Sequence, residues 1–143
     1  MALGIWGRIA IAAGMVGAAT TAFAAEAAMQ TGGRTSQPIG HYEFCRSYPS
    51  ECRSTGPRPA PLTLTAGAWG ALTRVNAQVN RAYKPMTDFD MWGQEEVWSY
   101  PTDAADCEDY VLEKRRRLIA AGIPAGNLLI TVLRQTNGDG HAV

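Results

Sequence analysis

A cysteine set among acids and a distant histidine are the residues of this chain best suited to covalent chemistry. Cys107 is flanked by three acids, Asp106, Glu108 and Asp109, and His141 lies near the end of the sequence. A thiol becomes a nucleophile when a base such as imidazole removes its proton. The pattern therefore indicates a Cys107/His141 pair, and the alternative is a buried, inert thiol with an exposed imidazole.

Cys107 is predicted to lie in the first turn of a helix. Asp106 occupies the N-cap position, basic residues follow from Lys114 to Arg117, and Gly122 with Pro124 marks the helix end. Backbone N–H groups and the positive end of the helix dipole favour a thiolate over a thiol at this position. The same N–H groups can stabilise an oxyanion.

The acids beside Cys107 oppose this activation, because their charge raises the pKa of a neighbouring thiol unless a cation offsets it. Clustered carboxylates are hard-oxygen ligands of the kind that Ca²⁺ accepts. Asp106, Glu108 and Asp109 are therefore candidate calcium ligands. The simpler interpretation is that these acids complement the positive end of the helix.

A preceding helix and a structured loop are predicted to support the cysteine-bearing helix. Apolar residues recur at helical spacing from Trp69 to Tyr83, Thr65 is a plausible N-cap, and Pro85 limits the end. The segment Thr87 to Pro101 combines aromatic residues and acids without a clear period. It is expected to lie over the core as a structured loop.

A C-terminal hairpin is predicted to bring the histidine back to the cysteine. The apolar, β-branched run from Leu128 to Leu133 predicts a buried strand. Asn137-Gly138 predicts the turn that follows it. The return strand would begin near His141, alongside the helix start that carries Cys107.

The N-terminus resembles a secretory signal peptide, residues 1–24. Arg8 forms a short basic start, an apolar run extends from Ile9 to Ala19, and Ala22-Phe23-Ala24 matches a small-x-small cleavage site. The apolar run is shorter than the ~20 residues of a membrane-spanning helix. We therefore expect a periplasmic or secreted protein with no stable membrane insertion after cleavage.

Export to an oxidising compartment would pair Cys45 with Cys52 in a disulfide. Closing this short loop would stabilise the fold by about 2–3 kcal/mol. A zinc site is the weaker interpretation, because His41 is the only further ligand nearby and zinc takes four. Residues 25–61 are accordingly predicted to be a mobile start and a disulfide-tied loop that adds no core, and residues 62–143 to be the functional domain.

The charge balance excludes several classes of partner. The 143 residues contain 13 Lys and Arg against 13 Asp and Glu, a formal net charge of zero. Nucleic acids and anionic membranes favour clustered, surplus basic residues. The run from Lys114 to Arg117 faces an acidic helix start and is better explained as a solvated surface. No nucleic-acid partner is expected, and 46% hydrophobic residues indicate a folded chain.

Two short motifs carry a family resemblance. Asp106-Cys107-Glu108-Asp109-Tyr110 followed by Gly140-His141-Ala142-Val143 resembles the bacterial transglutaminase-like cysteine peptidases. Upstream residues follow the family order: Val75-Asn76, Val79-Asn80, Gly93, Trp98 and Pro101. The resemblance extends from about Ile39 to Val143. It implies an α+β, papain/transglutaminase-like fold with helices packed on an antiparallel sheet.

The resemblance also implies an activity. Cys107 would attack the scissile carbonyl of a protein substrate and His141 would transfer the proton, with no cofactor required for the chemistry. Some members resemble calcium-dependent periplasmic proteases that cut surface adhesins. By that likeness Asp106, Glu108 and Asp109 would bind calcium, and the substrate would be a cell-surface or periplasmic protein. A binding module that has lost turnover and an acyl transferase using the same thiol remain open alternatives.

Three departures from the family pattern affect the expected activity. Ala105 stands where Gly is frequent, and Glu96 stands where Asp is common. The family continues past its His-Ala-Val motif through strands that supply an Asp to orient the histidine. Asp139 is poorly placed to replace it, and losing a third triad member can reduce turnover about 10⁴-fold. The chain is therefore expected to be C-terminally short, with an incomplete sheet.

Overall fold

The computed structural model describes residues 29, 31–54, 56–57 and 59–143. The chain divides into two compact units, residues 1–34 and 35–143, and the described helices and strands all lie in the second. The predicted signal peptide, residues 1–24, falls outside the described residues. Within the described ranges, no helix is long and apolar enough to cross a membrane.

Short helices and strands follow one another through residues 35–143. In chain order they are α1 (Ile39–Ser47), α2 (Ala66–Ala82), β1 (Lys84–Pro85), α3 (Asp88–Trp92), β2 (Ala104–Ala105), α4 (Cys107–Ala120), the 3₁₀ turn η1 (Ala125–Asn127), β3 (Val132–Arg134) and β4 (Gly140–Ala142). β1 and β2 pair in parallel, whereas β3 and β4 form an antiparallel hairpin. The α+β class is as predicted. The helix-packed antiparallel sheet is not confirmed, because the described residues form two separate two-stranded sheets.

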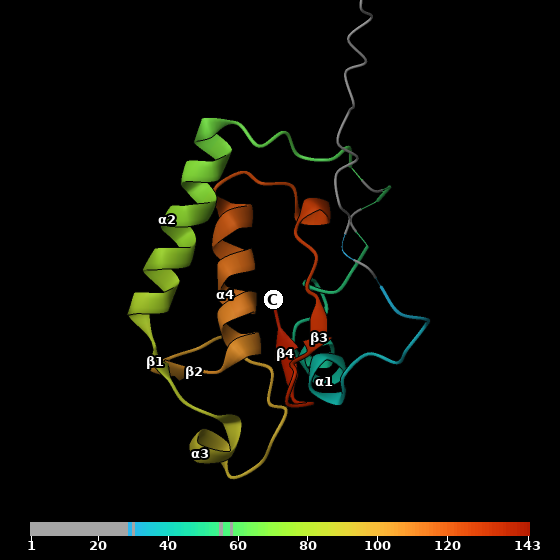
Figure 1. Cartoon of the computed structure of the whole chain (residues 1–143), viewed down its shortest axis with the longest axis vertical. Helices are drawn as coiled ribbons and strands as arrows, with labels where there is room; N and C mark the ends of the chain where they lie inside the picture. The colour runs from blue at the N-terminus through green and yellow to red at the C-terminus, as the bar shows by residue number, and fades with distance from the viewer. Residues whose placement is uncertain (1–28, 30, 55, 58) are drawn as a thin grey trace, which may run out of the picture. The chain divides into compact units, whose positions relative to one another are not determined.

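Helices α2 and α4 lie side by side and enclose one apolar cluster (Figure 1). The Thr65 hydroxyl accepts a hydrogen bond from the Ala68 amide at 3.2 Å, which places the start of α2 at the predicted N-cap. The buried members of the cluster are Val75, Val79, Leu118 and Ile123. Both predicted helices are therefore confirmed. Trp69 is 59% exposed, so the buried stripe of α2 is narrower than its periodicity suggests.

Helix α1 adds core where the sequence predicted none. Phe44 of α1 is 3% exposed and packs with Trp98 and Leu112 in a second cluster. Cys45 of the same helix forms the predicted disulfide with Cys52. The expectation of a coreless loop across residues 25–61 is wrong here. The apolar partners of Phe44 come from segments far along the chain, so no local periodicity reveals the burial.

The apolar run that predicted a buried strand is mostly not a strand. Leu128 packs against the α2–α4 cluster, whereas Ile130 packs against the Phe44 cluster. Backbone pairing begins only at Thr131, which exchanges two hydrogen bonds with Val143, and both Val132 and Leu133 are exposed, at 50% and 36%. Leu128 and Ile130 pack against two different apolar clusters in succession, so this part of the chain does not form one buried strand.

The turn after β3 is confirmed as a hairpin turn. Gly138 has a φ of 95°, a left-handed conformation that glycine adopts without strain. The Asp139 amide donates to Asn137 Oδ1 at 3.1 Å. The predicted loop between Thr87 and Pro101 contains a short helix, α3, whose N-cap is the Thr87 hydroxyl.

Candidate active site

Helix α4 holds Cys107 at its first residue. The preceding strand β2 is fixed by its pairing with β1, and Ala105 within it is fully buried. Asp106 adopts an extended backbone as the N-cap residue, although its side chain makes no capping hydrogen bond. Cys107 therefore follows a paired strand and lies at the positive end of its helix, and the residue is half-buried.

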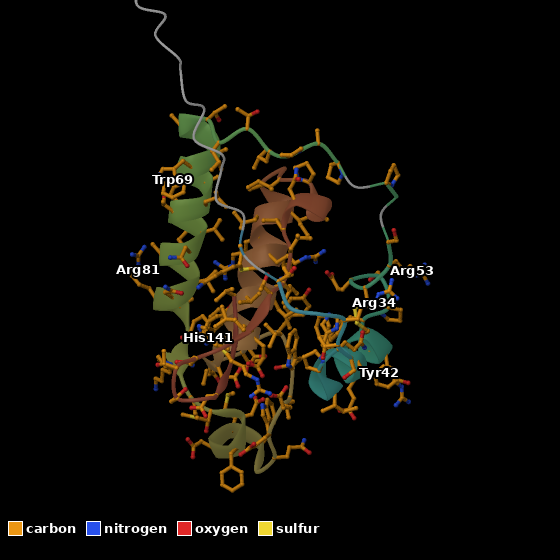
Figure 2. The ribbon with its side chains drawn as sticks, turned by 45° about the vertical axis from the view of Figure 1, so that its right-hand side comes forward. Arg34, Tyr42, Arg53, Trp69, Arg81 and His141 are labelled. Carbon is orange, nitrogen blue, oxygen red and sulfur yellow. A yellow bond between two sulfur atoms is a disulfide. The ribbon has the colours of Figure 1, made fainter. Side chains whose placement is uncertain are left out.

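The β3–β4 hairpin delivers His141 to the same place. The Ala142 amide, next to His141, donates to Cys107 Sγ at 3.5 Å. Cys107 and His141 both line one small cavity of about 60 Å³, together with Trp98 and other residues. Figure 2 labels His141 on this hairpin. The structure therefore brings the predicted nucleophile and the predicted base to one cavity.

The thiol of Cys107 is directed toward an acid and not toward the imidazole. Cys107 Sγ donates to Glu108 Oε2 at 3.0 Å, and no described residue is hydrogen-bonded to the His141 ring. Burial and the Glu108 contact raise the pKa of the Cys107 thiol to about 11, while the Ala142 amide lowers it. At neutral pH the thiol is therefore the favoured form.

This raised thiol pKa predicts the pH dependence of alkylation. In chelator, the rate of Cys107 alkylation by iodoacetamide should climb about tenfold per pH unit until the pH approaches the thiol pKa near 11, because only the thiolate reacts. Glu108→Gln should move the midpoint to lower pH by removing one adjacent charge, although burial keeps it above 9. Stopped-time mass spectrometry measures the rate. Glu95→Gln, at an exposed acid, is the charge-matched control and should leave the midpoint unchanged.

Three carboxylates gather beside the cysteine. Oxygens of Asp88, Asp106 and Glu108 lie within 4.8 Å of one another. Asp88 and Glu108 are 4% and 6% exposed. Oδ1 of Asp88 and Oδ1 of Asp106 are buried without a hydrogen-bond partner among the described residues. Burial and mutual repulsion raise the pKa of Asp88 and of Asp106 to about 6.

The acid that sequence reasoning missed is Asp88. It precedes Asp106 by a long stretch of chain and belongs to α3, so spacing gave no signal for it. Asp109, which was predicted as a ligand, instead accepts hydrogen bonds from the Ser99 amide at 2.7 Å and the Ser99 hydroxyl at 3.3 Å. Burial raises the pKa of Asp109 to about 7. The structure thus groups Asp106 and Glu108 with Asp88, and Asp109 holds the loop before β2.

An orienting acid for His141 is not found among the described residues. Asp139 Oδ2 accepts from the Asn137 side-chain amide at 2.6 Å, within the turn. Asp106 belongs to the carboxylate group beside Cys107. No described residue therefore orients the imidazole by a hydrogen bond, and the β3–β4 hairpin places it in the cavity lining.

Comparison with family models supplies the identification. The model for the bacterial transglutaminase-like cysteine proteinases, BTLCP, matches residues 31–143. The chain belongs to this family. Comparison of this BTLCP member with curated proteins and with solved structures gave no match. Family membership makes a cysteine peptidase with a protein substrate the general expectation for the chain.

Proposed function

We propose that this BTLCP member cleaves a protein substrate with Cys107 as nucleophile and His141 as general base. One observation carries the assignment. The chain has three cysteines, Cys45 and Cys52 are joined in a disulfide, and Cys107 is the free thiol. This thiol opens α4 and lines the same cavity as His141, one of only two histidines in the sequence.

The proposed chemistry uses Cys107 and His141 once the thiol has turned from Glu108 toward the imidazole. His141 takes the Cys107 proton, and the thiolate attacks the scissile carbonyl to form a tetrahedral oxyanion. The imidazolium returns its proton to the leaving amine as the C–N bond breaks, which leaves a thioester on Cys107. Water activated by His141 then hydrolyses the thioester and restores the thiol. Backbone N–H groups at the start of α4 would stabilise the oxyanion.

Calcium is the proposed companion ion, and the carboxylate group fits it. Asp88, Asp106 and Glu108 offer clustered oxygens, two of which are buried without a partner. The sequence predicted Asp109 as the third ligand. That prediction remains an alternative to the ligand set that contains Asp88. A bound cation would supply positive charge next to the thiolate and so offset the carboxylates that raise the Cys107 pKa.

Export belongs to the same proposal. The Cys45–Cys52 bond supports an oxidising compartment, because structural disulfides persist there. In a periplasmic or secreted location the enzyme would meet periplasmic and cell-surface proteins, so we propose a protein of this kind as the substrate.

One competing function has an observation in its favour. A non-catalytic binding module would keep the cavity but not the turnover. The thiol pKa of about 11 and the lack of an acid on His141 among the described residues agree with it.

Trapping the acyl intermediate separates the two functions. The full chain is incubated with unfolded carboxymethylated casein in excess Ca²⁺ and then quenched in acid. Mass spectrometry should find new peptide termini and a casein-derived thioester on Cys107. Cys107→Ala should give neither, while transfer of the casein acyl group from Cys107 to an added amine in place of water would indicate acyl transfer. Intact casein with an unmodified wild-type Cys107 would refute the peptidase and favour the binding module.

A further inference from the structure

A groove continues from the Cys107 cavity along the outside of the hairpin. Its volume is about 830 Å³, and one wall is β3. The other wall is formed by residues 35–39 and Tyr42 of α1, which Figure 2 labels. Pro38, Val132 and Gly140 line both the groove and the cavity, so the two hollows are continuous.

The backbone of β3 offers hydrogen-bonding groups toward its free edge. Thr131 and Val143 exchange two backbone hydrogen bonds at 2.9 Å. Antiparallel pairs alternate between exchanging both bonds and exchanging none. In the observed register, Val132 and Arg134 belong to the second kind of pair, so their N–H and C=O groups point away from β4. No described strand pairs with that edge.

The opposite strand supports this alternation. Ala142 faces Val132 across the ladder, and its amide points outward on the β4 side, where it donates to Cys107 Sγ. The hairpin therefore has one edge turned to the cysteine and the other turned away from it. A free strand edge is the usual template for an added peptide strand.

The side chains of the groove define what it can hold. Ile39, Tyr42 and Val132 are apolar and at least half exposed. Arg134 is the charged residue of the lining. Its Nη1 donates to the Gly138 carbonyl at 3.1 Å, and it forms no ion pair with any described acid.

We infer that the groove binds an extended segment of the protein substrate along β3 and that Arg134 selects an acidic side chain in that segment. The inference rests on the proposed peptidase function for the position of the scissile bond. Strand residues rise about 3.3 Å each, and Arg134 lies two residues beyond Val132, which borders the cavity. Because the free edge of β3 is the edge turned away from Cys107, the acidic residue is expected several residues from the bond that is cleaved and not beside it. Acids at the bond itself are disfavoured, because Glu96 and Glu108 line the cavity.

Binding to an inactive variant tests this inference without requiring turnover. The full-length Cys107→Ala chain, in excess Ca²⁺, is titrated into fluorescein-labelled decapeptide pools that fix Asp or Lys at each position in turn. Anisotropy should show about fivefold tighter binding for Asp than for Lys at one position, the size expected of a partly exposed ion pair. Adding Arg134→Glu should reverse that preference. Arg81→Glu, which changes the same charge on the exposed surface of α2, should preserve it.

The outcomes distinguish this inference from the proposed function. Equal binding of Asp and Lys pools, or an Asp preference that survives Arg134→Glu, would overturn the inference even if wild type cleaves protein. An Arg134-dependent preference in a chain that cleaves nothing would uphold the groove and reject the peptidase.

Gly140 provides a second, steric test. A Cβ at Gly140 meets no atom within 4 Å, so a larger side chain would extend into open space where groove and cavity join, without disturbing the fold. Gly140→Leu should weaken pool binding about tenfold while iodoacetamide still labels Cys107 in the otherwise wild-type chain. Gly67→Leu, at a position in α2 where a Cβ would lie in ordinary contact with Thr65 Oγ1 at 3.8 Å, is the control. Unchanged peptide binding by Gly140→Leu would contradict the proposal that the bound segment passes from the groove into the cavity at Gly140.

Discussion

His141→Asn is expected to slow substrate cleavage about 10³-fold while leaving the melting temperature nearly unchanged. A positioned general base typically contributes 10²–10⁴ to a rate, and His141 is the proposed base, which lines the Cys107 cavity. The side chain is half-buried on β4 and makes no hydrogen bond to a described residue, so little stability depends on it. Release of peptides from casein, measured between pH 5 and 9, gives the rate and its pH profile.

The second histidine provides the control for this loss. His41 lies on α1, where its ring packs edge-on against Trp98 at 5.0 Å. His41→Asn should lower the melting temperature more than His141→Asn does, yet preserve most of the cleavage rate. A His141→Asn enzyme with a wild-type rate and pH profile would exclude His141 as the base.

Calcium is expected to raise the melting temperature by about 10 °C, and Asp88→Asn should abolish most of that rise. A ligand at 100 times its Kd stabilises the native state by about 2.7 kcal/mol, and a domain of this size gains roughly 4 °C per kcal/mol. In the presence of chelator, the order of the two melting temperatures should be reversed. Asp88→Asn should melt above wild type, because it removes one of three mutually repelling carboxylates and keeps an acceptor for the Val97 amide. Scanning calorimetry with EDTA or with excess Ca²⁺ measures both effects.

Matched variants separate the possible ligand sets. Asp103→Asn, at an exposed acid, should leave the calcium shift intact. Asp109→Asn tests the ligand expected from the sequence, and loss of the shift there but not in Asp88→Asn would favour that grouping. A wild-type melting temperature that is insensitive to Ca²⁺ would refute the cation proposal altogether.

Local signals in the sequence were sufficient for the elements that carry the chemistry. The start of α2 at Thr65, the placement of Cys107 in the first turn of α4 and the turn at Gly138 each depend on neighbouring residues. Capping, dipole complementarity and the conformational freedom of glycine act over a few residues, so they can be read from the chain. The Cys45–Cys52 disulfide was similarly accessible, since few thiols compete for pairing.

Contacts between distant segments decided the rest. Burial of Phe44 depends on Trp98 and Leu112, and the apolar run after η1 divides between two clusters, so periodicity misjudged both. Asp88 joins Asp106 only because the fold brings the first residue of α3 close to the residues that begin α4. The sequence by itself determined which thiol and imidazole are available and that the thiol opens a helix. Tertiary structure alone decided that Asp88 joins Asp106 and Glu108 and that burial adds to their effect on the thiol, because desolvation and charge repulsion depend on proximity in space.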